Sequence, residues 1–175
     1  MVKTITILML FSFLISGKNT SKTNIVTVSE RQIAVNNSPY FIKGICYHPV
    51  PKGSDQRDFS NLSEDLKLML EAVINTIRVY SPIAEESVLN KIDAAGIKVI
   101  IGFTAGNGGY DIASGGYLNY INTYKNQDAI LLWDLGNEYN CHPDWFGGNM
   151  DNWYSLMNNA AAEIHAIDPD HPVST

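Results

Sequence analysis

The sequence predicts an α/β fold in which parallel strands alternate with helices. Short segments rich in β-branched and apolar residues recur along the chain, and segments with a helical spacing of apolar residues separate them. The composition, with 45% hydrophobic and 17% charged residues, is typical of a packed domain. This order of elements implies parallel strands joined by right-handed crossovers. Closed barrels and open doubly wound sheets share it, and periodicity alone does not separate the two.

The N-terminus predicts an export signal. Lys3 precedes an apolar run from residue 5 to residue 15, which only Thr6 and Ser12 interrupt. This run is too short to span a bilayer, which takes about 20 apolar residues, but it fits the core of a secretory signal peptide. We therefore expect a signal peptide over residues 1–17, a polar tether over residues 18–24, and export to the periplasm or the extracellular space. A buried N-terminal strand is the alternative interpretation.

The domain that follows, residues 25–175, is expected to begin with a small hairpin. Residues 25–35 alternate loosely and contain β-branched side chains, and residues 36–39 are a turn signal. The hairpin leads into residues 40–47, which we predict as the first core strand.

The first helix is predicted from two patterns. Asn61 and Glu64 have the spacing of the two partner residues in a helix capping box. Behind them runs the apolar stripe of a helix, made of Leu66, Met69, Leu70 and Val73. The short β-branched segment 76–80 is then the second strand.

The next helix is expected to start at Ser81-Pro82, because proline is tolerated in a first turn. Gly96 stands where a left-handed helix end belongs. Residues 97–103 form the third strand, which is apolar on both faces and therefore expected to be covered on both sides.

The remaining elements repeat this order. After a glycine-rich rim loop come a helix, the fourth strand, a second helix that Asp168-Pro169 ends, and the start of a fifth strand. They are expected at residues 105–116, 117–125, 129–135, 151–167 and 172–175.

Charge and cysteine content exclude several classes of function. The net charge is −6 and no cluster of Lys and Arg is present, which does not fit a nucleic-acid-binding protein. Cys46 and Cys141 are too few for a disulfide framework, and we expect two separate thiols. No Cys/His cluster predicts a metal site, and we predict no membrane association beyond the signal peptide.

Polar side chains follow the expected strands where each strand ends. They are Tyr47 and His48 at the first strand, Arg78 and Tyr80 at the second, and Asn137 and Glu138 at the fourth. Working residues of parallel α/β folds sit at the C-terminal ends of the strands. We therefore expect these side chains to gather on one rim.

Glu138 is the candidate catalytic group. A carboxyl directly after a buried strand is expected to be partly desolvated, which raises its pKa and suits a general acid. A solvated glutamate at a strand end is the alternative. Asp134 lies four residues earlier, about 13 Å away along the strand, and is expected to be a structural acid.

The aromatic residues after the fourth strand allow two interpretations. Tyr139, Trp145 and Phe146 could stack on sugar rings, or they could pack the loop in which they lie. The sequence leaves both open.

Four segments resemble the first four strand motifs of clan A glycoside hydrolases, which include the barrels of families 2 and 5 and the β-1,3-glucanosyltransferases of family 72. They are Phe41-Ile42-Lys43-Gly44-Ile45-Cys46-Tyr47-His48, Asn75-Thr76-Ile77-Arg78-Val79-Tyr80, Asp93-Ala94-Ala95-Gly96-Ile97-Lys98-Val99-Ile100 and Trp133-Asp134-Leu135-Gly136-Asn137-Glu138. The resemblance covers roughly residues 33–175. It implies a partial (β/α)₈ TIM barrel with strands 1 to 4 and the start of strand 5.

The resemblance also implies a retaining glycoside hydrolase or transglycosylase that acts on a β-linked polysaccharide without a cofactor. Glu138 would be the acid/base and Asn137 would bind the sugar 2-hydroxyl. Arg78 would brace the nucleophile, and His48 would line the −1 subsite. The other substrate-binding candidates on this rim are Tyr47, Tyr80 and Trp145.

Retaining chemistry needs a second carboxylate about 5–5.5 Å from the first, and in the clan this group ends strand seven. A complete barrel takes about 200 residues or more. We therefore expect the 175 residues to reach about halfway round the ring and to have little activity without the missing C-terminal half-barrel. The motif also departs from the clan at residues 72–74, where a glycine commonly precedes the Asn-Thr step.

Two alternatives remain at this point. The chain could be a non-catalytic truncated or split half-barrel with exposed apolar edges. It could also be an open α/β carbohydrate-binding protein, which a glycine-rich turn after the first strand would favour. The sequence has no such turn there.

Overall fold

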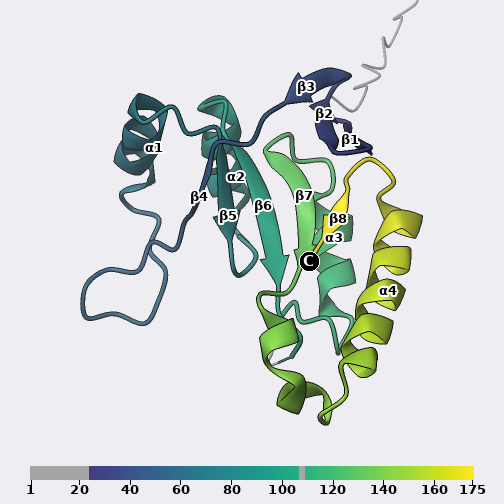
Figure 1. Ribbon diagram of the computed structural model, residues 1–175. Coiled ribbons are helices and arrows are strands. Elements are labelled where there is room, and N and C mark those ends of the chain that lie inside the picture. Colours follow the sequence, from purple (N-terminus) through teal and green to yellow (C-terminus); the bar gives the residue numbers. More distant parts are fainter. Residues whose placement is uncertain (1–23, 107–108) are drawn as a thin grey trace, which may run out of the picture.

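The computed structural model describes residues 24–106 and 109–175, which form an antiparallel sheet, a parallel sheet and the helices around them (Figure 1). The antiparallel sheet contains β1 (Val26–Ser29), β2 (Gln32–Val35) and β3 (Ser38–Tyr40). The parallel sheet contains, in this order, β4 (Gly44–Cys46), β5 (Thr76–Val79), β6 (Lys98–Phe103), β7 (Ile130–Leu135) and β8 (Val173–Ser174). The helices are α1 (Leu62–Glu71), α2 (Glu86–Ala94), α3 (Gly116–Tyr124) and α4 (Met150–Ile167), with the 3-10 helices η1 (Tyr139–Cys141) and η2 (Pro143–Phe146).

The predicted alternation of parallel strands and helices is confirmed. Each strand of the larger sheet pairs in parallel with the next strand along the chain. One of the α-helices α1 to α4 lies between each successive pair. All five strands therefore end at the same edge of the sheet, where the candidate residues were expected.

The helices share a core with one face of this sheet. The strand residues of this face, matched by register, are Ile77, Val79, Val99, Ile101, Phe103, Trp133 and Leu135. They are buried together with Leu66 of α1, Leu89 of α2, Tyr120 of α3 and Ile164 of α4. The opposite face carries Arg78 and Asp134. Doubly wound sheets differ, because helices cover both of their faces.

The antiparallel sheet lies at the N-terminal ends of the parallel strands (Figure 1). The Tyr40 hydroxyl donates to the Asn75 carbonyl at 2.8 Å and lies 2.9 Å from Thr76 Oγ1, at the start of β5. Asn24 is buried and donates to the Ile130 carbonyl, at the start of β7. Asn24, the last residue of the expected tether, is thus part of the packed unit.

The first core strand is shorter than predicted. Only residues 44–46 pair with β5, because residues 38–40 instead form the third antiparallel strand against β2. Residues 40–47 therefore contribute to both sheets. Their sequence pattern does not show where the antiparallel strand ends and the parallel strand begins.

The predicted capping box of α1 is wrong. The Asn61 side chain makes no cap hydrogen bond, and its backbone carbonyl accepts from Glu64 and Asp65 instead. The helix ends at residue 71, so Val73 of the predicted stripe lies beyond it, and Leu70 in its last turn also faces solvent. Leu70 is 49% exposed and Val73 is 62% exposed.

The start of α2 also differs from the prediction. The helix begins at Glu86, not at Ser81-Pro82. The Ser81 and Pro82 carbonyls accept hydrogen bonds from Arg57 Nη1 and Nη2 at 2.8 and 2.7 Å. These carbonyls are therefore held by a side chain and do not begin a helix.

Three expected segments lie wholly or partly outside the described residues. They are the signal peptide over residues 1–17 and the tether up to residue 23, as well as residues 107 and 108 of the glycine-rich loop. Within residues 24–106 and 109–175, no helix has both the length and the apolar character needed to cross a membrane.

Candidate active site

Arg78 connects β5 to the end of β7. Its Nε and Nη2 atoms donate to Asp134 Oδ2 at 2.9 and 2.5 Å. Nη1 donates to Asn137 Oδ1, and Nη2 also donates to the Gly136 carbonyl, both at 3.0 Å. A planar guanidinium group with several donors fixes geometry well. The segment after β7 is thus held in one position relative to β5.

Asp134 is a satisfied structural acid, as predicted. It is 4% exposed, and its second oxygen accepts from Ser174 Oγ of β8 at 2.8 Å. Burial alone would lower the pKa of Arg78, but the hydrogen bond and charge of Asp134 outweigh burial and raise it. The guanidinium group therefore stays charged.

Gly102 of β6 lies between these two partners. It is paired with Asp134, and it stands two residues after Ile100, the partner of Arg78, on the same face of the sheet. A Cβ atom at Gly102 would lie 2.6 Å from the Val79 carbonyl oxygen. The neighbouring backbone of β5 thus leaves no room for a side chain at Gly102, the residue of β6 that pairs with Asp134.

Glu138 follows directly on the segment that Arg78 holds. Its backbone is left-handed, with φ 55° and ψ 23°. A non-glycine residue rarely adopts this conformation, and such residues cluster at functional sites. Within the described residues its side chain is exposed. The partial desolvation that was expected for this carboxyl is therefore not observed.

Tyr139 fixes this turn from the other side. The Ala105 backbone N–H donates to the Tyr139 hydroxyl at 2.7 Å, and the Tyr139 ring lies 4.6 Å from the Trp153 ring. A Cβ atom at Gly136 would lie 2.2 Å from this ring. Tyr139 thus joins the loops after β6 and β7. Of the two roles that the sequence left open for Tyr139, stacking on a sugar or packing its loop, these contacts show the packing role, for which Gly136, three positions earlier, was a possible signal.

Tyr80 joins the Arg78 group from the side of β4. Its hydroxyl donates to Cys46 Sγ at 3.1 Å, and Arg78 Cζ lies 4.9 Å from its ring centroid. His48 is exposed just beyond the end of β4. Cys46 was not among the candidate residues, but its register opposite Arg78 brings it to the same face.

Tyr47 lies apart from this group. Its side chain is buried, its hydroxyl donates to Asp65 Oδ2 of α1 at 2.6 Å, and its ring lies 6.3 Å from Phe59. Tyr47 therefore packs in the helical core, on the side of the sheet away from Arg78.

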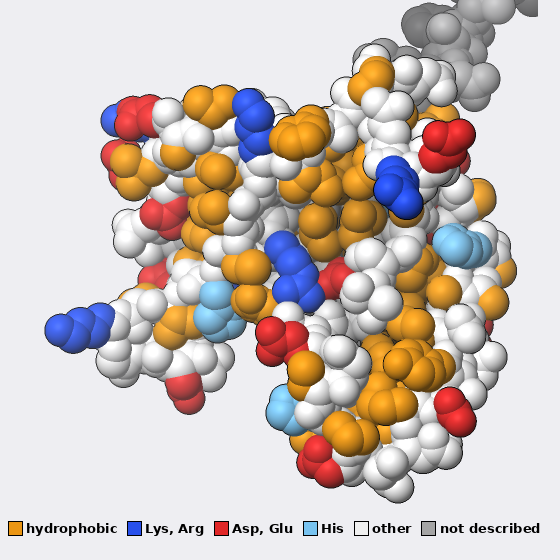
Figure 2. All heavy atoms as spheres, in the orientation of Figure 1, with side chains coloured by type: hydrophobic (Ala, Val, Ile, Leu, Met, Phe, Trp, Pro, Cys, Tyr) orange, Lys and Arg blue, Asp and Glu red, His pale blue; other side chains and the backbone are white. Residues whose placement is uncertain are grey.

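A pocket of about 510 Å³, which we call the aromatic pocket, lies between the loops after β6 and β7. It is lined by Thr104, Ala105, Gly106, Ala113, Tyr139, Trp145, Phe146 and Leu156. Trp145 is 57% exposed and stacks on His142, with ring centroids 4.1 Å apart and planes 5° apart. Figure 2 shows hydrophobic side chains gathered at the lower end of the molecule, where Figure 1 places the segment that follows β7.

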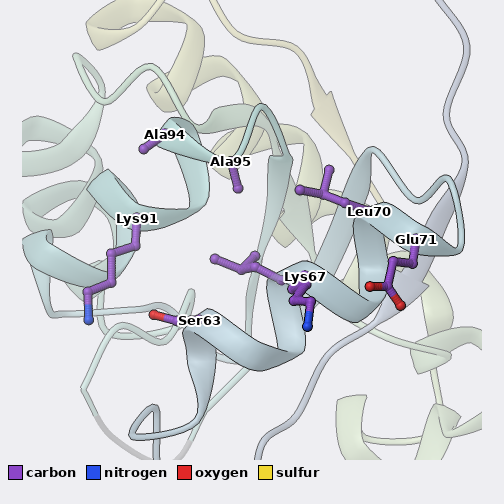
Figure 3. A pocket seen from close by; sticks show the side chains of 8 residues that line it. Ser63, Lys67, Leu70, Glu71, Lys91, Ala94 and Ala95 are labelled. Atoms are coloured by element: carbon purple, nitrogen blue, oxygen red, sulfur yellow. The ribbon is translucent and has the colours of Figure 1, made fainter.

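A pocket of about 440 Å³ lies between α1 and α2, away from the strand ends. Figure 3 shows its labelled lining residues, which are Ser63, Lys67, Leu70 and Glu71 of α1 and Lys91, Ala94 and Ala95 at α2. The two helices cover the face opposite Arg78, so this pocket is separate from the candidate site.

The group at the strand ends has the components for proton transfer to a bound hydroxyl or ether oxygen. Glu138 has an exposed carboxyl, and Asn137 has an amide that can donate and accept hydrogen bonds. Among residues 24–106 and 109–175, no group of three or more His, Cys, Asp or Glu side chains could hold a metal ion.

No protein-family model matches the sequence. The chain is similar to a β-galactosidase of Pseudoalteromonas haloplanktis, with 26% identity over 156 residues that cover 81% of this chain and 14% of that protein. It is also 36% identical, over 63 residues, to an Arabidopsis thaliana protein named mannan endo-1,4-β-mannosidase 4. These residues cover 33% of this chain and 15% of that protein.

Solved structures show the same fold. The β-glucuronidase of Faecalibacterium prausnitzii superposes with a TM-score of 0.66 at 23% identity, over 86% of this chain and 27% of that one. The family 2 β-galacturonidase of Eisenbergiella tayi, bound to galacturonate, gives 0.67 at 23% identity, over 86% and 28%. The similarity to clan A glycoside hydrolases that the strand motifs predicted is thus confirmed. The chain spans a small part of each of these proteins.

Proposed function

We propose that this chain is the acid/base-bearing part of a retaining glycoside hydrolase or transglycosylase that cleaves O-glycosidic bonds of a β-linked polysaccharide. The carrying observation is that one guanidinium group, that of Arg78, holds Asp134, Gly136 and Asn137 and so fixes the segment that ends in Glu138. The glycoside hydrolase relatives support the broad class.

Glu138 is the proposed acid/base. In the first step its carboxyl gives a proton to the departing glycosidic oxygen, and in the second step its carboxylate takes a proton from the attacking water or sugar hydroxyl. Asn137 is the proposed partner of a sugar hydroxyl. Its Oδ1 atom accepts from Arg78, which leaves its Nδ2 group as the donor.

A retaining mechanism also needs a nucleophile about 5–5.5 Å from the acid/base. Asp134 is unsuited to this role, because both of its oxygens are engaged by Arg78 and Ser174. We propose that the nucleophile belongs to further βα units, and that these 175 residues alone are inactive.

We further propose that these units pair with both edges of the parallel sheet and close it into a barrel. Helices on one face are the barrel arrangement, since a barrel has an outer ring of helices. At the β4 edge, Ile45 is 40% exposed and Phe41 is 79% exposed, and an edge with exposed apolar residues favours pairing. Export after removal of residues 1–17 stays a proposal, based on the apolar run near the N-terminus.

The test is hydrolysis of aryl β-glycosides and β-glucans by a protein in which these residues are joined to the further units. We expect Glu138→Gln to lower kcat by about 10²–10⁴-fold, while Glu71→Gln on the outer face has no effect. Azide needs no base, so it should restore turnover of an activated aryl glycoside by Glu138→Ala and give a glycosyl azide of retained configuration. Full turnover by Glu138→Gln would refute the proposed role.

A further inference from the structure

We infer that Tyr80 is a positioning residue, whose ring, anchored by its hydroxyl on Cys46, holds the Arg78 guanidinium group in the orientation that reaches Asn137. This inference rests on the proposed function only for the reaction that the Arg78 group serves. The role is separate from the contact with substrate that was expected of Tyr80.

The contact between Arg78 and Asn137 is the one most easily lost. The guanidinium group binds Asp134 through both Nε and Nη2, whereas Asn137 receives one hydrogen bond, from Nη1 at 3.0 Å. Asp134 is buried, but Asn137 is exposed, so water competes for its Oδ1 atom. Hydrogen bonds weaken steeply when donor and acceptor are out of line. A small rotation of the guanidinium group about its bonds to Asp134 would therefore release Asn137.

The Tyr80 ring opposes this rotation. Tyr80 stands two residues after Arg78, so the two side chains leave the same side of the chain, and Arg78 Cζ lies over the ring, 4.9 Å from its centroid. A cation within about 6 Å of the face of an aromatic ring is attracted to it. The hydrogen bonds of Arg78 act at its nitrogen atoms, and the ring acts at the central carbon. The ring thus adds a point of contact that the hydrogen bonds do not supply.

Cys46 anchors the far end of the ring. The Tyr80 hydroxyl donates to Cys46 Sγ at 3.1 Å, and Cys46 pairs with Arg78 in the register of β4 and β5. The sulfur also acts on the cation, since burial lowers the pKa of Arg78 while Asp134 and then Cys46 raise it. The Tyr80 side chain is therefore held at both ends, by its own backbone after β5 and by Cys46 of β4.

A fixed Arg78 in turn fixes the Asn137 amide. A side-chain amide has an acceptor oxygen and a donor nitrogen, which a half turn exchanges. The hydrogen bond from Arg78 to Oδ1 selects one of these two orientations, so that Nδ2 is the group offered to a sugar hydroxyl. Tyr80 thus decides which atom of Asn137 meets the substrate, and it does so through Arg78.

Exchange of the arginine Nε–H protons with water, measured by NMR on the 175-residue chain, tests this inference without catalysis. The chain has three arginines, and the Arg78 signal is the one that Arg78→Lys removes. We expect Tyr80→Leu to speed exchange at Arg78 about two- to fivefold, as for the loss of an exposed cation–π contact, and to shift the Asn137 Nδ2 signals toward those of a free amide. Tyr80→Phe keeps the ring but loses its anchor, so it should give a smaller change that Cys46→Ala reproduces.

Arg57 is the internal control. It binds the Ser81 and Pro82 carbonyls, and its Cζ lies 5.6 Å from the Phe59 ring centroid. A substitution that merely loosens the fold should speed exchange at Arg57 as well. Unchanged exchange at Arg78 in Tyr80→Leu, or an equal rise at Arg57 and Arg78, would overturn the inference.

Tyr80→Phe decides the matter if Tyr80→Leu does not fold, because it retains the ring. Unchanged exchange at Arg78 in Tyr80→Phe would then overturn the inference. Glu138→Gln should leave the Arg78 and Asn137 signals unchanged. If loss of the Tyr80 ring frees Arg78 but the joined enzyme does not depend on Glu138, only the proposed function fails.

Discussion

Arg78 and Asp134 form an ion pair between strands that are not neighbours, with Arg78 Nη2 2.5 Å from Asp134 Oδ2 across the intervening strand β6. The acid is almost fully buried, and about a quarter of the Arg78 side chain is accessible. The pair therefore does more than stabilise the sheet, because the same guanidinium group positions Asn137 and the backbone before Glu138.

The first prediction concerns this pair. Arg78→Met leaves a buried carboxylate without its cation, and we expect it to lower the free energy of unfolding by about 2–3 kcal/mol, less than for a fully buried pair because Arg78 is partly exposed. Arg78→Lys keeps the charge but loses the planar fork, and we expect a loss of about 1–2 kcal/mol. Urea denaturation measures both.

The double variant Arg78→Met/Asp134→Leu is the control. Replacing both partners with apolar side chains removes the unpaired charge, so it should cost less than Arg78→Met alone. A double variant that is less stable than the single one would contradict the argument that the unpaired Asp134 carboxylate causes the loss.

The second prediction concerns the strand between the partners. Gly102→Ala places a Cβ atom 2.6 Å from the Val79 carbonyl oxygen, and backbone cannot yield as a flexible side chain does. We expect a loss of about 2–3 kcal/mol, as for overpacking in a core, measured by urea denaturation. Gly106→Ala meets no atom within 4 Å and should be close to neutral. Equal effects of the two changes would contradict the crowding argument.

The order of strands and the position of Glu138 could be predicted because both depend on local signals. The buried strand 130–135 is apolar except for Asp134, and Asn137-Glu138 follows it after a single glycine. The partners of Arg78 could not be predicted, because reaching across β6 depends on the register of three strands. Tyr47 was expected on the rim for a similar reason, since a strand of only three residues has too little alternation to show which way its last side chain points. The aromatic pocket depends on two loops that meet only in the folded chain.

The third prediction concerns alkaline pH. Burial raises the pKa of Tyr47, Tyr117 and Tyr120 above the ordinary 10.0, with Asp65 adding to the effect at Tyr47 and Glu163 at Tyr117. The unfolded chain therefore loses these protons near pH 10 while the folded chain keeps them. Stability is fully present below about pH 10 and falls as pH rises toward the folded pKa values, by at most about 1.4 kcal/mol per pH unit for each tyrosine.

Urea denaturation between about pH 8 and pH 11, with tyrosinate absorbance recorded in parallel, measures this effect. Tyr47→Phe and Tyr117→Phe should each flatten the alkaline slope. Tyr154→Phe, at an exposed site on α4, should leave it unchanged. Stability that stays constant to pH 11 would contradict the assignment.

The last prediction comes from two helix ends of the same type. In α1 the Val73 N–H bonds to the Leu70 carbonyl and the Ile74 N–H to Met69, and in α2 the Gly96 and Ile97 N–H groups bond to Asp93 and Ile92 in the same pattern. This is the helix ending that needs a left-handed residue, usually glycine. Gly96 has φ 72° and Val73 has φ 60°, so a β-branched residue occupies a position suited to glycine, at the segment where the sequence departs from the clan motif.

A left-handed conformation costs a non-glycine residue about 1–2 kcal/mol, and Val73, 62% exposed, buries little in return. Glycine offsets part of the gain, because it adds entropy to the unfolded chain. We therefore expect Val73→Gly to raise the free energy of unfolding by about 0.5–1 kcal/mol and Gly96→Val to lower it by about 1–2 kcal/mol, both measured by urea denaturation. The two substitutions exchange the same side chains at equivalent helix ends. Destabilisation by both would mean that Val73 makes contacts that outweigh its backbone strain.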